Sequence, residues 1–164
     1  MRHRARGRAL AKGQAREGAA DAAARQVSLT QAEVQQAREL LESVMTIAAH
    51  GILYRWGQSL GARILTDANK VGGDPIKAVS AVLAERGWAK EVTFYQSKVA
   101  VLGCLEAKQN TEPCCHIMRG IIHVIVAGGD GGVIVREEKC AGQGAMDCQF
   151  TIVRGGKVVK EILA

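Results

Sequence analysis

Apolar residues at alternating spacings of three and four predict helices in the first half of the chain. The first helix is expected to begin at Ser28 or Thr30, because either residue makes a good N-cap. Gly51 is expected to bend or end this helix, and a second helical pattern continues from Leu53 to Leu65. One apolar stripe on the first helix consists of Val34, Ala37, Leu41, Val44 and Ala48.

Glycine and proline positions refine this helical part of the chain. Gly57 and Gly61 are four residues apart in the second helix. Small residues at this spacing favour close packing of the helix backbone against another element, at some loss of helix propensity. In the third helix Asp74 is the N-cap, Pro75 occupies the first turn and Gly87 marks the end.

After residue 90 the apolar period changes from near four to two, which predicts strands. Pro113 opens a fourth helix, which the glycine-rich residues 128–132 close. Separate runs of helices and strands indicate an α+β fold, with N-terminal helices followed by an antiparallel sheet and one further helix that carries a metal ligand. The expected strands are 91–96, 98–105, 133–139, 148–154 and 157–163, the last two joined by a turn at Gly155-Gly156.

Charge divides the chain into two parts. The formal net charge is +6, and residues 1–26 hold seven basic against two acidic residues, which leaves 15 basic and 14 acidic residues in the rest. We therefore expect a disordered basic tail over residues 1–26 and one α+β domain over residues 27–164. The near-neutral domain argues against a nucleic-acid-binding surface, so nucleic acid is expected to contact only the tail. A solvated tail, a nucleic-acid arm and an organelle transit peptide are the alternatives for residues 1–26.

The apolar runs are shorter than the ~20 residues that cross a bilayer, so no membrane span is predicted. The N-terminus lacks the continuous apolar segment of a secretory signal. An odd number of cysteines, five, then indicates a reducing compartment. The predicted location is cytoplasmic.

Cysteine and glutamate residues in the second half are spaced to hold one metal ion. Cys115 on the fourth helix could face Glu137, Cys140 and Cys148 from a strand and a loop. Three thiolates and one carboxylate would fill a tetrahedral zinc site and leave no position for water, so the zinc would be structural. Cys114 is an alternative to Cys115 as the ligand. Buried cysteines that bind no metal are the other interpretation of this spacing.

Two segments resemble the 4-vinyl reductase domain family, and the likeness covers roughly residues 45–154. The upstream segment is Leu53-Tyr54-x-x-Gly57-x-x-x-Gly61. The C-terminal segment is Cys115-His116-x-x-Arg119-Gly120, followed by Glu137-x-x-Cys140-x-x-x-Gly144-x-x-x-Cys148-x-Phe150. The spacing of the C-terminal segment is specific, whereas the upstream match alone would be weak.

This resemblance implies an α+β domain that forms dimers, related in fold to TRAPP subunits and to the aromatic-sensing domains of phenol-responsive transcription activators. In those sensors a zinc held by Cys, Glu, Cys and Cys lies beside an apolar pocket for an aromatic effector. The Arg119-Gly120 match favours Cys115 over Cys114, and Cys104, which has no counterpart, is expected to be a buried strand residue. The implied zinc ligands are Cys115, Glu137, Cys140 and Cys148.

Other chemical signals are weaker. The glycine-rich residues 128–132 follow a helix, whereas a phosphate-binding loop precedes one, and no dinucleotide fingerprint is found. Glu138 is expected to face solvent. The histidines His50, His116 and His123 are expected on helix surfaces or in the core. The aromatic residues that could line an apolar cavity, or simply pack in the core, include Trp56, Trp88 and Phe94.

The sequence therefore predicts a non-catalytic domain that binds a small hydrophobic molecule, aromatic or tetrapyrrole, and contains a structural zinc. The family name offers a second hypothesis, a reductase or accessory protein for the vinyl group of a chlorophyll precursor. The absence of a nicotinamide or flavin motif in the sequence weighs against it. A third hypothesis is a scaffold or assembly subunit, acting as a homodimer or within a larger complex.

Overall fold

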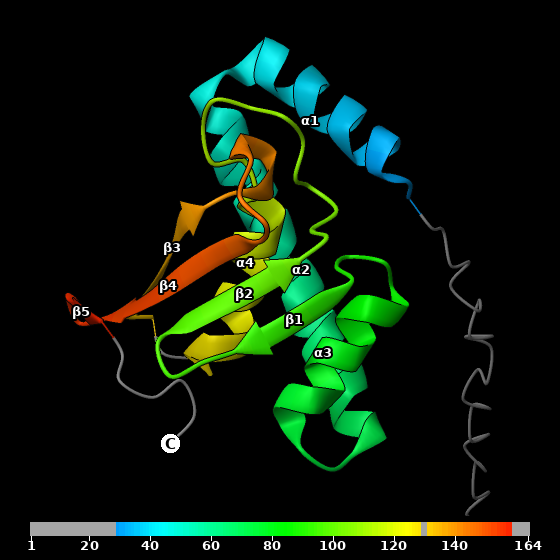
Figure 1. Ribbon diagram of the computed structural model, residues 1–164, viewed down its shortest axis with the longest axis vertical. Coiled ribbons are helices and arrows are strands. Elements are labelled where there is room, and N and C mark those ends of the chain that lie inside the picture. Colours follow the sequence, from blue (N-terminus) through cyan, green and yellow to red (C-terminus); the bar gives the residue numbers. More distant parts are fainter. Residues whose placement is uncertain (1–28, 129–130, 159–164) are drawn as a thin grey trace, which may run out of the picture.

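The computed structural model describes residues 29–128 and 131–158 (Figure 1). The predicted α+β class is confirmed, because three helices precede a sheet whose strands are interrupted by one further helix. The helices are α1 (Gln31–Met45), α2 (Ile47–Val71), α3 (Pro75–Glu85) and α4 (His116–Ala127). The strands are β1 (Glu91–Phe94), β2 (Lys98–Leu102), β3 (Val133–Lys139), β4 (Cys148–Arg154) and β5 (Lys157–Val158), and a short 3-10 helix, η1 (Ala141–Gln143), lies between β3 and β4.

Two predictions lie outside the described residues. They are the basic tail over residues 1–26 and the continuation of the last strand beyond residue 158. Among the described residues, no helix is both long and apolar enough to span a membrane.

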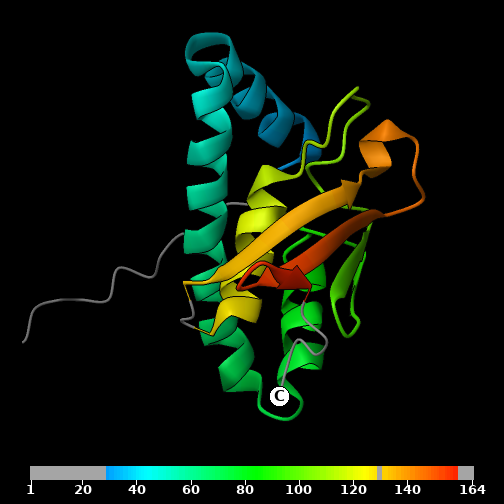
Figure 2. The same cartoon turned by 90° about the vertical axis from the view of Figure 1, so that its left-hand side faces the viewer.

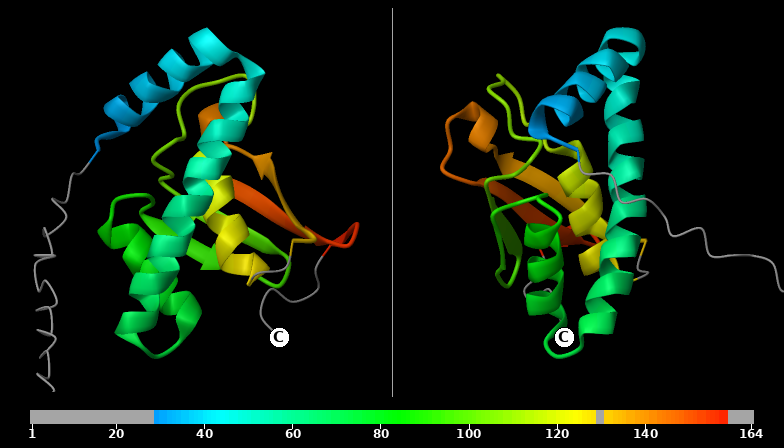
Figure 3. Two further views of the ribbon diagram at one scale, coloured as in Figure 1. Left: turned by 180° about the vertical axis from the view of Figure 1, so that it is seen from behind. Right: turned by 90° about the vertical axis from the view of Figure 1, so that its right-hand side faces the viewer.

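The molecule has three layers, with α4 between α2 and the sheet (Figures 2 and 3). The sheet is antiparallel in the order β1-β2-β4-β3, and β5 pairs with the end of β4. α3 packs against α2 and β1. The core is mainly aliphatic, and its buried aromatic residues are Phe150, fully buried on β4, and Trp88, which is 8% exposed. Because α4 is enclosed on two sides, its N-terminus points into the protein rather than into solvent.

The break between the first two helices lies at Thr46, and the prediction of a break at Gly51 is wrong. Of the two predicted N-caps, Ser28 and Thr30, Thr30 caps α1, and it does so through a complete capping box with Glu33. Thr46 has φ 50° and ψ −128°, a conformation uncommon for a β-branched residue, and its N–H donates to the Glu42 carbonyl. Gly51 lies inside α2, where packing along the helix outweighs the roughly 1 kcal/mol of helix propensity that glycine loses. Val44 beside the break is 75% exposed, so the predicted apolar stripe is buried only in part.

The glycines of α2 and α4 allow the two helix backbones to touch. A Cβ at Gly57 or Gly61 would collide with the backbone of Ile117 or Ile121 on α4. A Cβ at Gly120 would collide with the Tyr54 carbonyl on α2. The close packing predicted from the glycine spacing is therefore confirmed, and α4 is its partner. This contact sets the separation of α2 and α4.

A shift in strand register near the end of β3 affects how its acidic residues are oriented. The strand pairs regularly with β4 up to Glu137, and the register then shifts between Glu137 and Lys139. Such a bulge re-aims the side chains beside it. The hairpin from β4 to β5 turns at Gly155 and Gly156, both with positive φ, which confirms that predicted turn.

Candidate metal centre

Four elements bring the predicted metal ligands together. Cys115 is the N-cap of α4, and Glu137 lies on β3 beside the bulge. Cys140 follows β3 and leads into η1, and Cys148 begins β4. One potential ligand atom from each residue lies within 4.8 Å of the other three. Residues separated by more than thirty positions thus converge where the N-terminus of α4 meets the sheet.

The sulfur–sulfur distances suit a tetrahedral thiolate site. Cys115 Sγ lies 3.8 Å from Cys140 Sγ and 3.5 Å from Cys148 Sγ. With Zn–S bonds of about 2.3 Å, tetrahedral geometry places two sulfur ligands about 3.8 Å apart. All three cysteines are free thiols with no surface exposure. The spacing therefore matches ligands of one ion better than the roughly 2.05 Å of a disulfide.

Glu137 supplies a buried carboxylate that the protein satisfies only in part. Its Oε2 accepts a hydrogen bond of 3.0 Å from the Cys115 N–H. Its Oε1 is buried and has no hydrogen-bond partner among the described residues. Burial raises the pKa of this carboxyl. An unpartnered oxygen beside three thiols is the arrangement that a bound cation would complete. Glu138, the next residue, is exposed and lies 3.7 Å from Lys98 in an ion pair, as predicted for a solvent-facing side chain.

The loop between Cys140 and Cys148 is held in place by neighbouring backbone. The Ala141 N–H donates to Cys148 Sγ at 3.3 Å, a contact that stabilises a thiolate. Gly142 packs so closely on residue Lys108 that a Cβ would collide with the Lys108 carbonyl. The Gly142 carbonyl also accepts from the Asn110 N–H at 2.9 Å. Contacts with protein atoms therefore hold the start of this loop in place.

Two further thiols extend the group. Cys114 Sγ is 3.5 Å from Cys140 Sγ, and Cys104 Sγ is 3.6 Å from Cys115 Sγ. Cys104 is buried as predicted, but it follows the end of β2 and does not lie in a strand, which corrects that part of the prediction. The reason is that the chain turns at Gly103, where φ is +63°. Sequence spacing alone could not show that Cys104 would reach the cluster.

Hydrogen bonds between the thiols lower the pKa of some of them and raise the pKa of others. Bonding from Cys104 lowers the pKa of Cys148 to about 3, and bonding from Cys115 lowers the pKa of Cys114 to about 5. Hydrogen bonding with Cys104 contributes most to raising the pKa of Cys115. The protein therefore favours thiolates at some positions of the cluster, and a metal must displace the remaining protons.

Glu106 is a second buried carboxylate that the sequence interpretation missed. It is 1% exposed, and its two oxygens accept from the N–H groups of Ile117 at 2.8 Å and Met118 at 2.6 Å in the first turn of α4. Burial raises its pKa to about 8. The only available signal was an acidic residue two positions after Cys104, in a loop with no regular pattern.

Histidines lie on the opposite side of the N-terminus of α4. The rings of His50 and His116 stack with centroids 4.0 Å apart, and His50 Nε2 lies 3.3 Å from Glu42 Oε1. Burial lowers the pKa of His116 to about 3, so its ring is neutral at physiological pH. The prediction of a core position is confirmed for His116, whereas His50 and His123 are half-buried. The two stacked histidines are therefore not part of the four-residue group, which consists of three thiols and Glu137.

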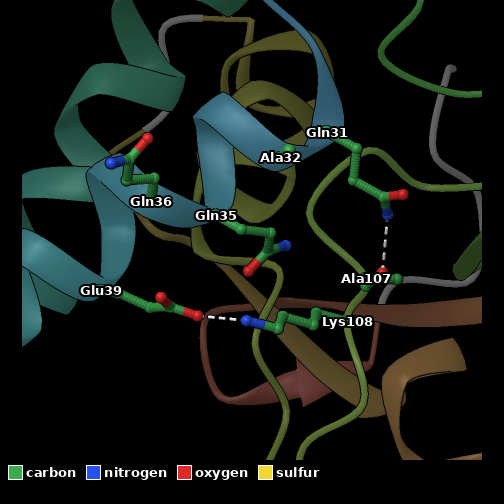
Figure 4. Close-up of a pocket in the computed structure, with 7 residues that line it drawn as sticks. All are labelled: Gln31, Ala32, Gln35, Gln36, Glu39, Ala107 and Lys108. Atoms are coloured by element: carbon green, nitrogen blue, oxygen red, sulfur yellow. Dashed lines mark hydrogen bonds and ion pairs between the residues drawn. The ribbon is translucent and has the colours of Figure 1, made fainter.

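The aromatic candidates come from α2, the segment after α3 and β1, and the Trp88 carbonyl accepts from the Leu105 N–H at 2.9 Å, next to Cys104 and Glu106 in the chain. Trp56 and Trp88 pack edge to face with ring centroids 6.5 Å apart, and Phe94 packs against the core from β1. A separate groove of about 410 Å³ lies between α1 and the loop at Ala107 and Lys108 (Figure 4). Glu39 pairs with Lys108 across this groove, and five of its seven lining residues are polar or charged and none is aromatic. The groove therefore does not coincide with the predicted aromatic site.

Comparison with known proteins supports the fold. The sequence matches no protein-family model and no curated protein. The phenol-responsive sensory domain of the transcription activator PoxR, solved with phenol, shares the fold with a TM-score of 0.66 and 17% identity, over 79% of this chain and 76% of that chain. A vinyl-4-reductase family protein from Methanocaldococcus jannaschii aligns with a TM-score of 0.49 and 17% identity, over 62% of this chain and 67% of that chain.

The PoxR domain is one of the phenol-responsive sensors that the sequence motifs resemble, and at 17% identity the likeness establishes a common fold and nothing about ligands. The predicted relationship in fold to phenol-responsive sensor domains is therefore confirmed. The relationship to TRAPP subunits stays a prediction.

Proposed function

We propose that this chain is a non-catalytic domain that binds a small hydrophobic molecule and is braced by a structural zinc ion. The single observation that carries the metal part is the convergence of four buried donor atoms within 4.8 Å of one another. The zinc ligands in this proposal are Cys115, Glu137, Cys140 and Cys148.

The donor set supports zinc over harder ions. Thiolates select soft or borderline ions, whereas Mg²⁺ and Ca²⁺ take oxygen ligands. Four protein donors complete a tetrahedron, so a zinc ion bound there has no open position for water and supplies a cross-link rather than a reaction. The cross-link would join α4, the end of β3 and the start of β4.

The proposed hydrophobic molecule lies against Trp56, Trp88 and Phe94. Support comes from the edge-to-face contact of Trp56 and Trp88, from the packing of Phe94 against the core, and from the fold shared with a domain that was solved with phenol. Aromatic side chains offer a large apolar surface and edge-to-face contacts to an aromatic molecule. The chain's only two tryptophans, its largest aromatic side chains, are both in this set.

Native mass spectrometry of gently purified, reduced protein tests both parts. We expect one zinc per chain and a retained apolar molecule. Titration with phenol should then give a saturable change in the emission of the two tryptophans. Phe94→Ala should weaken this response, whereas Tyr95→Ala should not, because Tyr95 is 58% exposed. A protein without metal or bound molecule that does not respond to phenol would refute the proposal.

A homodimer is the second part of the functional proposal. Three large apolar side chains at the junction of α1 and α2 are exposed: Leu40 at 66%, Val44 at 75% and Ile47 at 80%. Adjacent exposed apolar residues of this size favour association, and a second copy is the proposed partner. Light scattering after gel filtration should give twice the chain mass, and Ile47→Asp should shift it to the monomer. A monomer in the unmodified protein would refute this part.

A further inference from the structure

A second group of donor atoms shares Cys115 with the proposed zinc site. It consists of Cys104, Glu106 and Cys115, and one ligand atom from each lies within 4.8 Å of the others. These residues are 2%, 1% and 0% exposed. Cys104 and Cys115 place their sulfur atoms 3.6 Å apart, close to the separation of two thiolates on one ion.

We propose that this group is a second metal position, which takes a soft d10 cation and shares the Cys115 sulfur with the first ion as a bridge. The inference rests on the proposed zinc site, because the two positions have Cys115 in common. Cys104 and Glu106 supply the other two donors. A thiolate sulfur has lone pairs to bind two cations, so occupation of the first site does not exclude the second.

The surroundings of Glu106 favour a cation. Its carboxyl is buried, and the charged neighbours that act on it most strongly, Glu137 and Cys114, carry negative charge when ionised and disfavour its ionisation. Arg38, a buried cation that acts on Cys114, pairs with Glu42 at 2.9 Å through its Nε, and it is not among the main influences on the Glu106 carboxyl. With a pKa of about 8 the carboxyl is largely protonated near neutral pH, and a cation bound here would replace that proton and remove the repulsion from the neighbouring acids.

The hydrogen bonds that Glu106 already makes are compatible with this role. A carboxylate has about four lone-pair sites, and the N–H groups of Ile117 and Met118 take two of them. The same carboxylate can therefore cap α4 and bind an ion. If Glu106 were only a cap, and Cys104 only a hydrogen-bond donor to Cys115, the protein would hold one ion instead of two.

Cadmium is a suitable probe, because it is a soft d10 ion whose bonds to thiolates absorb in the ultraviolet. The full chain, reduced and freed of metal, would be titrated with Cd²⁺ in citrate, which removes ions held weakly by single side chains. We expect the thiolate absorbance to rise up to two equivalents and native mass spectra to show two cadmium ions per chain. Cys104→Ser and Glu106→Gln should each hold one.

His50→Ala is the control, because Glu42, His50 and His116 form another candidate group of three donors. This variant should keep two cadmium ions. One cadmium ion in the unmodified protein would overturn the second site and leave the proposed zinc site intact. Two ions in Cys104→Ser, or one in His50→Ala, would place the second ion elsewhere and also overturn the inference. No bound cadmium would refute both sites.

Discussion

Gly57 on α2 lies so close to α4 that Gly57→Ala should force the two helices apart. An added Cβ would lie 2.8 Å from the carbonyl carbon of Ile117. Carbon atoms pack best at about 3.5–4.0 Å, so the backbones must separate by about 0.7 Å or more. Gly51 in the same helix is the matched control, because a Cβ there meets nothing within 4 Å.

Both substitutions gain about 0.8–1.0 kcal/mol of helix propensity. Gly51→Ala gains only that term, so its free energy of unfolding should rise by about 1 kcal/mol. Gly57→Ala also carries an overpacking penalty at the upper end of about 1–3 kcal/mol, because the obstacle is backbone that cannot rotate away. The variants should therefore differ by about 3 kcal/mol, which corresponds to roughly 6–12 °C in Tm for a domain of this size.

Urea unfolding, followed by circular dichroism and by the emission of Trp56 and Trp88, measures this difference. Zinc affinity gives a second result, because a displaced α4 carries Cys115 away from the other proposed ligands. Gly57→Ala should bind zinc more weakly than Gly51→Ala. If Gly57→Ala were as stable as Gly51→Ala, the direct backbone contact between α2 and α4 would be wrong.

Three other predictions concern the metal centre and the core. Glu137→Gln should lower zinc affinity at least about tenfold, whereas Glu138→Gln should leave it unchanged; competition with a chromogenic chelator measures both. Phe150→Ala should lower the free energy of unfolding by about 3–5 kcal/mol, because Phe150 is fully buried, and a smaller loss in urea unfolding would contradict the packing. Zinc should be released as the pH falls, because protons compete with zinc for the thiolates. Burial also raises the pKa of Glu137, so this carboxyl protonates at a higher pH than an exposed one. Zinc retained in acid would contradict the ligand set.

Local patterns were sufficient to predict most elements of this fold. The N-cap at Thr30, the start of α3 at Pro75 and the turn at Gly155-Gly156 each depend on residues that are neighbours in sequence. The break at Thr46 was missed, because threonine is not a residue that usually adopts positive φ and the nearby Gly51 offered a more obvious signal.

Only the residues that belong to the spaced motif could be predicted as part of the candidate site. The spacing of Cys115, Glu137, Cys140 and Cys148 led us to expect that they converge, and the structure brings them together. Glu106 was missed, and Cys104 was expected only as a buried strand residue, because their positions depend on how the loop after β2 folds back over the first turn of α4. Such tertiary contacts leave no periodic trace in the sequence.

Zinc K-edge X-ray absorption of protein loaded with one equivalent of zinc tests the central claim most directly. The proposed ligands predict three sulfur neighbours at about 2.3 Å and one oxygen neighbour at about 2.0–2.2 Å. Four sulfur neighbours would show that Cys104 or Cys114 replaces Glu137. A shell of nitrogen and oxygen alone would place the zinc outside the cysteine cluster and contradict the account.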